Sequence, residues 1–155
     1  MIVMRYFFLS ILLTTGLFTL TACTESTDSS ISKNDPDTNR WYTKQQVNNG
    51  DVIYQKHCAS CHQPDASGTT DWRQKTVDGK YPPPPLNGTA HTWHHPMDTL
   101  KRTIRMGGVP LGGSMPAFES RLNDQEIEET LAWIQSHWPD RIYNAWLERN
   151  RQASR

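Results

Sequence analysis

Residues 57–62 read HCASCH, and two thiols followed at once by a histidine could serve four kinds of chemistry. They could form a disulfide, a redox-active dithiol, a zinc site or the attachment site of a covalently bound haem. A disulfide between Cys58 and Cys61 would close a very small loop and would stabilise the fold little. Cys-X-X-Cys followed directly by His is the pattern of c-type haem attachment, in which His62 is the proximal iron ligand.

The second iron ligand determines what such a haem can do, because a methionine sulfur opposite the histidine favours electron transfer. The candidates are Met97, Met106 and Met115. Met115 lies within the irregular sequence GGSMPAF of residues 112–118, where two glycines loosen the backbone and a proline stiffens the far side. Met97 begins and Met106 ends an expected helix, where an unbranched thioether more often fills a core. We therefore expect Met115 to be the ligand.

Two other kinds of site stay open. Cys58 and Cys61 could bind zinc together with His91 and His95, although this grouping leaves His62 and the methionine loop without a role. A haem with its methionine absent or displaced could sense a gas or reduce peroxide, if a nearby histidine acted as an acid or base. The sequence HTWHH at 91–95 could supply that group. We expect its histidines to form a surface cluster beside the haem edge, because polar loops seldom bury imidazole.

The N-terminal segment indicates export. Arg5 precedes an apolar run from Tyr6 to Leu20, which is short for a membrane-spanning helix. The sequence LTAC ending at Cys23 resembles the lipobox of bacterial lipoproteins, in which the signal is cleaved before a cysteine that becomes lipidated. We predict a lipoprotein signal peptide over residues 1–22. The protein would then be in the cell envelope, lipid-anchored to a bacterial membrane, with its domain facing the periplasm or the cell exterior.

Residues 23–40 are predicted to be the lipidated Cys23 and a flexible tether, since they are rich in Ser, Thr, Asp and Asn and lack apolar periodicity. With Cys23 taken by lipid, Cys58 and Cys61 are the remaining cysteines of the chain. No odd thiol is left over, so this pair must carry the chemistry of the domain.

The domain itself is predicted to span residues 41–155, with a C-terminal helical extension from about residue 139. Capping residues, apolar spacing and helix breakers predict four helices. They run from Thr43 to about His57, from Met97 to about Met106, from Asn123 up to Pro139 and from about Arg141 to Arg149. Residues 63–88 are rich in Gly, Pro and Asp and are expected to be a loop. No segment shows a convincing strand period, so the fold class is all-α.

Composition narrows the function. The chain has 155 residues, 16 of them Lys or Arg and 16 Asp or Glu, so it has no net charge that would suit a nucleic acid. Hydrophobic residues make up 35%, and 10 prolines and 9 glycines interrupt them. A bulky apolar prosthetic group would fill a core that this composition fills poorly alone.

From about Thr43 to Trp138 the chain resembles a class I monohaem cytochrome c of bacterial lipoprotein form. Four segments carry the resemblance, and they occur in the expected order: CASCH at 58–62, PPLNG at 84–88, GGSMPAF at 112–118, and LNDQEI at 122–127 leading to LAWI at 131–134. The first segment alone is only moderately specific, whereas the four together are very specific.

The resemblance implies a cytochrome c fold, in which helices pack around one covalently bound haem c. It implies that His62 and Met115 are the axial ligands. It also implies that the backbone carbonyl of Pro84 accepts a hydrogen bond from His62. Trp93 is similar in place to family residues that hydrogen-bond a haem propionate.

The same resemblance predicts that Gly50 and Tyr54 cross against Trp133, so that the first and last helices of the core approach closely. It implies an electron carrier rather than an enzyme, passing single electrons from a donor to an acceptor through the haem edge. The expected partners are redox proteins, with membrane complexes foremost, and no nucleic acid.

Overall fold

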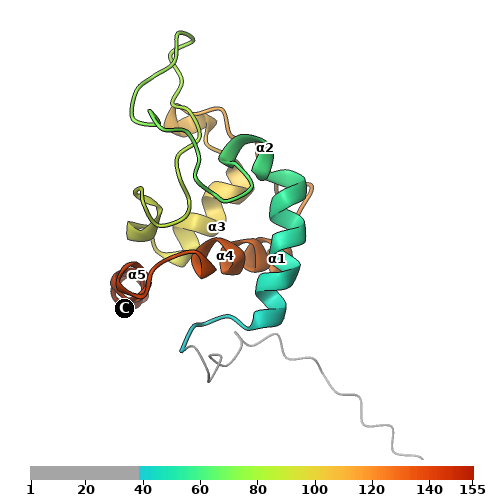
Figure 1. Ribbon diagram of the computed structural model, residues 1–155, viewed down its shortest axis with the longest axis vertical. Helices are drawn as coiled ribbons and strands as arrows, with labels where there is room; N and C mark the ends of the chain where they lie inside the picture. Colours follow the sequence, from blue (N-terminus) through green and yellow to red (C-terminus); the bar gives the residue numbers. More distant parts are fainter. Residues whose placement is uncertain (1–38) are drawn as a thin grey trace, which may run out of the picture. The chain divides into compact units, whose positions relative to one another are not determined.

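The computed structural model describes residues 39–155, and the predictions for the signal peptide, for Cys23 and for the tether up to residue 38 lie outside them. Within residues 39–155 the regular structure is helical, as Figure 1 shows. No strand occurs there, and an isolated bridge pairs Tyr81 with Gly113. No helix of this part is both long and apolar enough to cross a membrane. The prediction of an all-α fold is confirmed. The helices are α1 (Lys44–His57), α2 (Ala59–His62), η1 (Thr92–His94), α3 (Met97–Met106), η2 (Val109–Leu111), α4 (Asp124–Ser136) and α5 (Asp140–Ala153).

Both predicted capping boxes form. The Thr43 hydroxyl accepts from the Gln46 amide at 3.2 Å, and the Gln46 side chain accepts from the Thr43 amide at 2.9 Å. Asn123 and Glu126 make the same reciprocal pair before α4, at 3.0 and 2.8 Å. Each box satisfies two amide donors that the helix itself leaves unpaired. Helix α4 ends at Ser136, earlier than the predicted continuation up to Pro139.

Helices α1 and α4 cross at Gly50, and this crossing is visible in Figure 1. A Cβ atom at Gly50 would lie 1.9 Å from the carbonyl oxygen of Glu129, so only glycine allows the approach. One turn further along α1, the ring of Tyr54 stacks on that of Trp133 with 4.0 Å between centroids. The predicted crossing is therefore confirmed. It fixes the end of α1, where the Cys-X-X-Cys-His motif begins.

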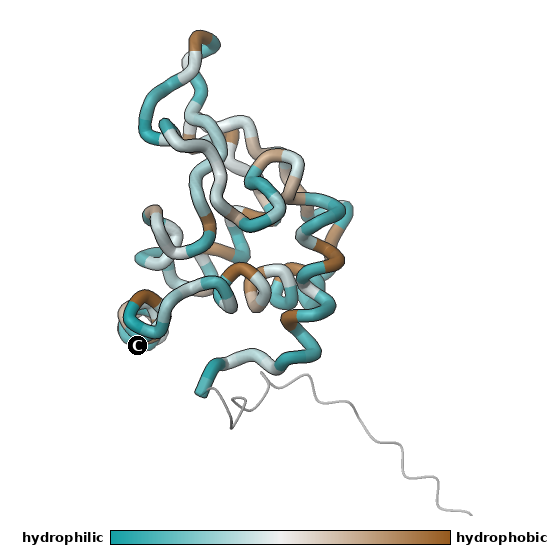
Figure 2. The backbone as a smooth tube through the Cα atoms, viewed as in Figure 1, coloured by the Kyte–Doolittle hydropathy of each residue, from teal (hydrophilic) through white to brown (hydrophobic). Residues whose placement is uncertain are grey.

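Helix α3 has the predicted bounds, with Pro96 before its first residue and Gly107 after its last. Two ion pairs join α3 to α4: Lys101 with Glu128 at 2.5 Å and Arg105 with Asp124 at 2.6 Å. In Figure 2, hydrophobic and hydrophilic stretches alternate along the helices, as expected for helices with one face packed against a core.

Helix α5 is longer than predicted at both ends, since it spans Asp140–Ala153 rather than about 141–149. Tyr143 and Trp146 are buried, so both side chains pack on the domain. The guanidinium of Arg40 contacts this helix twice, at 2.5 Å from the Asp140 carboxylate and 3.9 Å from the centre of the Tyr143 ring. The C-terminal extension is thus part of the packed domain.

Candidate functional site

The end of α1 presents the two thiols. The carbonyl of Cys58 accepts hydrogen bonds from the amides of Cys61 and His62, at 3.1 and 2.9 Å, and so forms the single turn α2. The hydroxyl of Tyr54 donates to the carbonyl of Gln63 at 2.9 Å, which ties the exit of the turn back to α1. Both cysteines are free. Burial raises the pKa of the Cys58 thiol to about 11, and the neighbouring Cys61 adds to the rise.

The imidazole of His62 is buried and held from one side. Its Nδ1 lies 2.9 Å from the carbonyl oxygen of Pro84, the contact that the resemblance implies. This bond assigns the proton to Nδ1 and leaves Nε2 as the nitrogen with a free lone pair. Burial lowers the pKa of His62, against the opposing effect of the Pro84 carbonyl, so the ring is neutral at pH 7.

Gly68 lets the loop reach this position. Its φ is +60°, and a Cβ atom there would lie 2.4 Å from the carbonyl carbon of Pro84. The Gly68 amide also donates to the carbonyl of His62 at 2.9 Å. The same glycine therefore binds the histidine backbone and allows the Pro84 carbonyl to reach the histidine ring. Sequence reasoning assigned Gly68 only to a loop.

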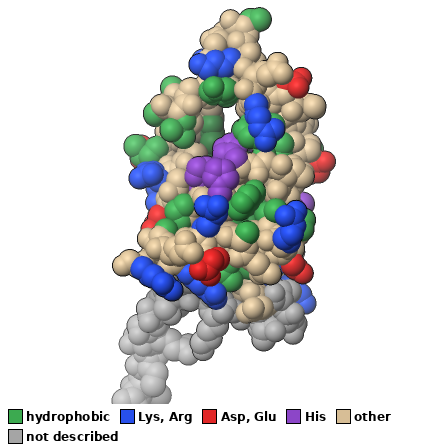
Figure 3. All heavy atoms as spheres, turned by 90° about the vertical axis from the view of Figure 1, so that its left-hand side faces the viewer, with side chains coloured by type: hydrophobic (Ala, Val, Ile, Leu, Met, Phe, Trp, Pro, Cys, Tyr) green, Lys and Arg blue, Asp and Glu red, His purple; other side chains and the backbone are tan. Residues whose placement is uncertain are grey.

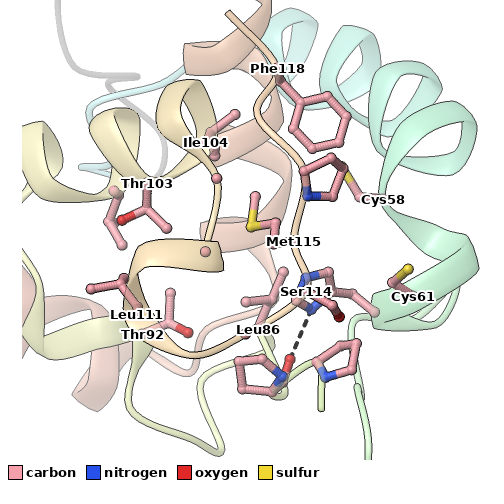
Figure 4. Close-up of a pocket in the computed structure, with 18 of the residues that line it drawn as sticks. Cys58, Cys61, Leu86, Thr92, Thr103, Ile104, Leu111, Ser114, Met115 and Phe118 are labelled. Carbon is pink, nitrogen blue, oxygen red and sulfur yellow. Dashed lines mark hydrogen bonds between the residues drawn. The ribbon is translucent and has the colours of Figure 1, made fainter. Parts of the chain in front are cut away.

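A cavity of about 1090 Å³ lies beside the motif, and Figure 4 shows its walls. Cys58, Cys61, His62, Pro84 and Met115 all line it. The rest of the lining is mostly apolar, from the loop over 81–86, helix α3 and helix α4. Ligand pockets typically measure about 300–1,000 Å³, so this cavity is slightly larger than most. The structure thus brings together the four side chains that the sequence singles out and the Pro84 carbonyl.

The Met115 loop is built onto the two glycines that follow α3. The Gly108 amide donates to the Met115 carbonyl at 3.0 Å, and the Gly113 amide donates to the Gly108 carbonyl at 3.0 Å. Gly107 has a φ of +78°, and a Cβ atom there would lie 2.7 Å from the Met115 carbonyl oxygen. These contacts fix the loop that carries the thioether into the cavity wall.

The three candidate methionines differ in position. Met115 is half-buried and packs against the core. It also lines the cavity, where Figure 4 labels its side chain. Met106 lines the rim but is 57% exposed. Met97 packs against the core and does not line the cavity. These positions favour Met115 as the iron ligand.

The histidines of the 91–95 segment gather on one face, which Figure 3 shows. His94 is exposed, whereas His91 and His95 are half-buried in the cavity wall, so the expectation of a wholly surface cluster is wrong for these two. Trp93 does not line the cavity, and its ring lies 5.4 Å from the guanidinium carbon of Arg149 on α5. The structure does not bring Trp93 to the site.

Other lining residues were missed from the sequence. Trp72 and Arg73 lie in the loop over residues 63–88. Arg102 lies in α3, and Arg121 lies just before α4. No local signal marks them, since they meet only through the tertiary fold. With respect to zinc, no three His, Cys, Asp or Glu side chains among the described residues come together as a metal site.

The donor set fits a covalently bound haem. The free thiols of Cys58 and Cys61 line the cavity. The neutral imidazole of His62 lines it too, with its Nδ1 bonded to the Pro84 carbonyl. The thioether of Met115 completes the set, and the cavity is otherwise mostly apolar. Thiols attach the haem, and imidazole and thioether are the axial ligands that raise its potential. The cavity wall also contains a buried polar atom without a partner, His91 Nδ1, which a polar group of the haem could satisfy.

This arrangement of helices and side chains defines a cytochrome c domain. The chain belongs to the family described as cytochrome C oxidase, cbb3-type, subunit III, whose family model matches residues 45–134. Haem-based electron transfer is the activity of such a domain. The matched range contains the Cys-X-X-Cys-His motif and the Met115 loop, while α5 lies beyond it. No curated protein and no solved structure gives a significant match.

Proposed function

We propose that this protein carries single electrons through one haem c, which Cys58 and Cys61 attach and which His62 and Met115 ligate. The observation that carries the proposal is the convergence of these four side chains on one cavity, with His62 Nδ1 bonded to the Pro84 carbonyl. When bound, the haem supplies an iron that alternates between ferrous and ferric states. The protein is then an electron carrier, and no substrate bond is made or broken.

The chain's own residues have three tasks in this function. The Pro84 carbonyl orients the His62 ring and keeps its proton on Nδ1. The Met115 loop occupies the place where an outside ligand would enter, and this favours electron transfer over gas binding or peroxide chemistry. The apolar residues that line the cavity around His62 and Met115 would exclude water from the haem.

We expect Met115→Ala to convert the carrier into a ligand-binding haem protein. The sulfur-to-iron charge-transfer band near the red end of the oxidised spectrum should disappear, and the reduced protein should bind carbon monoxide rapidly. Met106→Ala is the matched control, because Met106 lines the rim of the same cavity but is mostly exposed. That variant should keep the band. Rapid carbon monoxide binding by the unaltered protein would instead support the sensor or peroxidase alternative.

We further propose that Cys23 is lipidated after cleavage of residues 1–22, and that the domain is tethered to a bacterial membrane by residues 23–40. A diacylglyceryl group supplies the two chains that stable anchoring requires. The tether would keep the domain at high effective concentration near membrane complexes. The family description, an oxidase subunit, supports an oxidase complex as one redox partner.

The Cys23→Ala protein, exported through an ordinary cleavable signal, tests both parts of this proposal. It should leave the membrane fraction and partition into the aqueous phase of a detergent extraction. Its haem should also exchange electrons with washed membranes more slowly than the haem of the anchored protein. If the variant stays in the membrane fraction, the lipid anchor is wrong. Equal rates would contradict the role of the tether.

A further inference from the structure

The Nδ1 atom of His91 is buried and has no hydrogen-bond partner among the described residues. Its ring lines the cavity. A buried polar atom without a partner destabilises a protein, so most such atoms are paired with another protein group, a water molecule or a ligand. The haem proposed for this cavity carries two propionate carboxylates, which are hydrogen-bond acceptors.

The neighbours of His91 hold its ring in a fixed position. The ring stacks on Trp72, with 4.8 Å between centroids and 21° between planes, and the His95 ring meets it edge-on at 5.5 Å. The guanidinium carbon of Arg73 lies 4.2 Å from the centre of the same Trp72 ring. Burial lowers the pKa of His91, and the nearby His95, His94 and Arg73 lower it further. His91 is therefore neutral in this environment and can donate from Nδ1.

The charge of the cavity lining points to an anionic ligand. Lys56, Arg73, Arg102 and Arg121 line the cavity, and no Asp or Glu does. The chain as a whole carries equal numbers of acidic and basic residues, so the cavity wall departs from the average of the molecule. Arg73 makes no ion pair with any described residue. Its charge is available to a carboxylate beside His91.

The C-terminal helix, which lies beyond the range matched by the family, fixes the segment that carries His91. Trp146 Nε1 donates to the His95 carbonyl at 3.0 Å, and the Asn150 side chain accepts from the Met97 amide at 2.8 Å. At the other end of the segment, Trp138 Nε1 donates to the Leu86 carbonyl at 2.7 Å. These bonds hold the backbone on both sides of His91. Trp138, Trp146 and Asn150 all lie beyond the range that the family model matches.

We propose that His91 and Arg73 form a carboxylate-binding site in the cavity wall, which takes a propionate of the haem. His91 donates a hydrogen bond from Nδ1, Arg73 supplies the opposite charge, and Trp72 holds both in place. This inference rests on the proposed function, since it needs a haem in the cavity. It gives His91 the role that the family resemblance implied for Trp93.

The midpoint potential of the haem tests the proposal. A negatively charged carboxylate near the iron favours the ferric state, and a hydrogen bond or a positive charge on that carboxylate weakens this preference. His91→Phe keeps a ring on Trp72 but removes the donor. We expect the ratio of ferrous to ferric protein at a fixed ambient potential to fall at least about threefold, on a scale where tenfold corresponds to about 59 mV. His94→Phe is the matched control, since His94 belongs to the same ring cluster but is exposed. It should leave the ratio unchanged.

A double-mutant cycle shows whether His91 and Arg73 act on the same carboxylate, or whether Arg73 affects the haem only through its positive charge. Arg73→Gln should lower the same ratio, and its effect should be non-additive with His91→Phe, because both side chains act on one group. Arg102→Gln, which removes another cavity cation, should be additive with His91→Phe. Additive effects in both cycles, or a loss of thermal stability in His91→Phe without a change of potential, would overturn the proposal. Haem staining of the unaltered protein on a denaturing gel is done first. If that protein carries no haem, the proposed function is wrong, whereas the potentials of the variants test only the carboxylate site.

Discussion

Replacing both Cys58 and Cys61 with alanine is expected to abolish covalent haem attachment. In the proposed function each thiol forms one bond to the haem, and both thiols line the cavity that would receive it. In a host able to mature c-type haem, the unaltered protein should retain haem on a denaturing gel and show the mass of one attached haem. The double variant should show neither. Any haem that it retains non-covalently should be lost on denaturation.

Ser60→Ala is the control for this experiment, because Ser60 lies between the two cysteines and is exposed. It changes the same turn without removing a thiol, so haem attachment should be complete. The single variants Cys58→Ala and Cys61→Ala should each give at most one thioether bond. An unaltered protein that matures colourless, with unmodified mass at both sulfurs, would contradict the assignment of the cavity as a haem site.

The parts of the fold that could be predicted are those determined by short-range chemistry. Thr43 with Gln46 and Asn123 with Glu126 are capping boxes whose partners lie three residues apart, so the sequence alone contains the whole interaction. Gly107 ends α3 for an equally local reason, since its φ of +78° suits glycine best. The Cys-X-X-Cys-His motif is local too, so the sequence alone indicates its two thiols and its histidine.

The parts that could not be predicted depend on residues far apart in the chain. His91 lies in the cavity wall, and Trp146, 55 positions further on, donates a hydrogen bond to the carbonyl of His95 in the same segment. Trp72 and Arg73 reach the same wall from a loop that has no periodic pattern. His57 is half-buried, with its ring edge-on to that of Phe118, 61 positions further along the chain. None of these contacts leaves a signature in the neighbouring sequence.

Gly50→Ala is expected to lower the free energy of unfolding by about 1–3 kcal/mol or more, the usual cost of overpacking a well-packed contact. The added Cβ would lie 1.9 Å from the Glu129 carbonyl oxygen and 2.5 Å from its carbon. Both atoms belong to the backbone of α4, so no flexible side chain can move aside. Alanine gains roughly 0.5–1 kcal/mol of helix propensity over glycine, which is too little to offset the clash. Urea unfolding followed by circular dichroism measures the difference.

Asn48→Ala provides the comparison in the same helix, because Asn48 is exposed and its replacement adds helix propensity without a contact. It should be neutral or slightly stabilising, whereas Gly50→Ala should be clearly destabilised. The clash must also move α1 away from α4 and weaken the stack of Tyr54 on Trp133. Since α1 ends at His57, directly before Cys58, which we propose as the first attachment cysteine, that movement should lower the yield of haem-loaded protein as well as its stability. If the Gly50→Ala protein is as stable as the Asn48→Ala control, this prediction is wrong. The crossing of α1 and α4 would then not be a close contact, and the position of the motif would not depend on it.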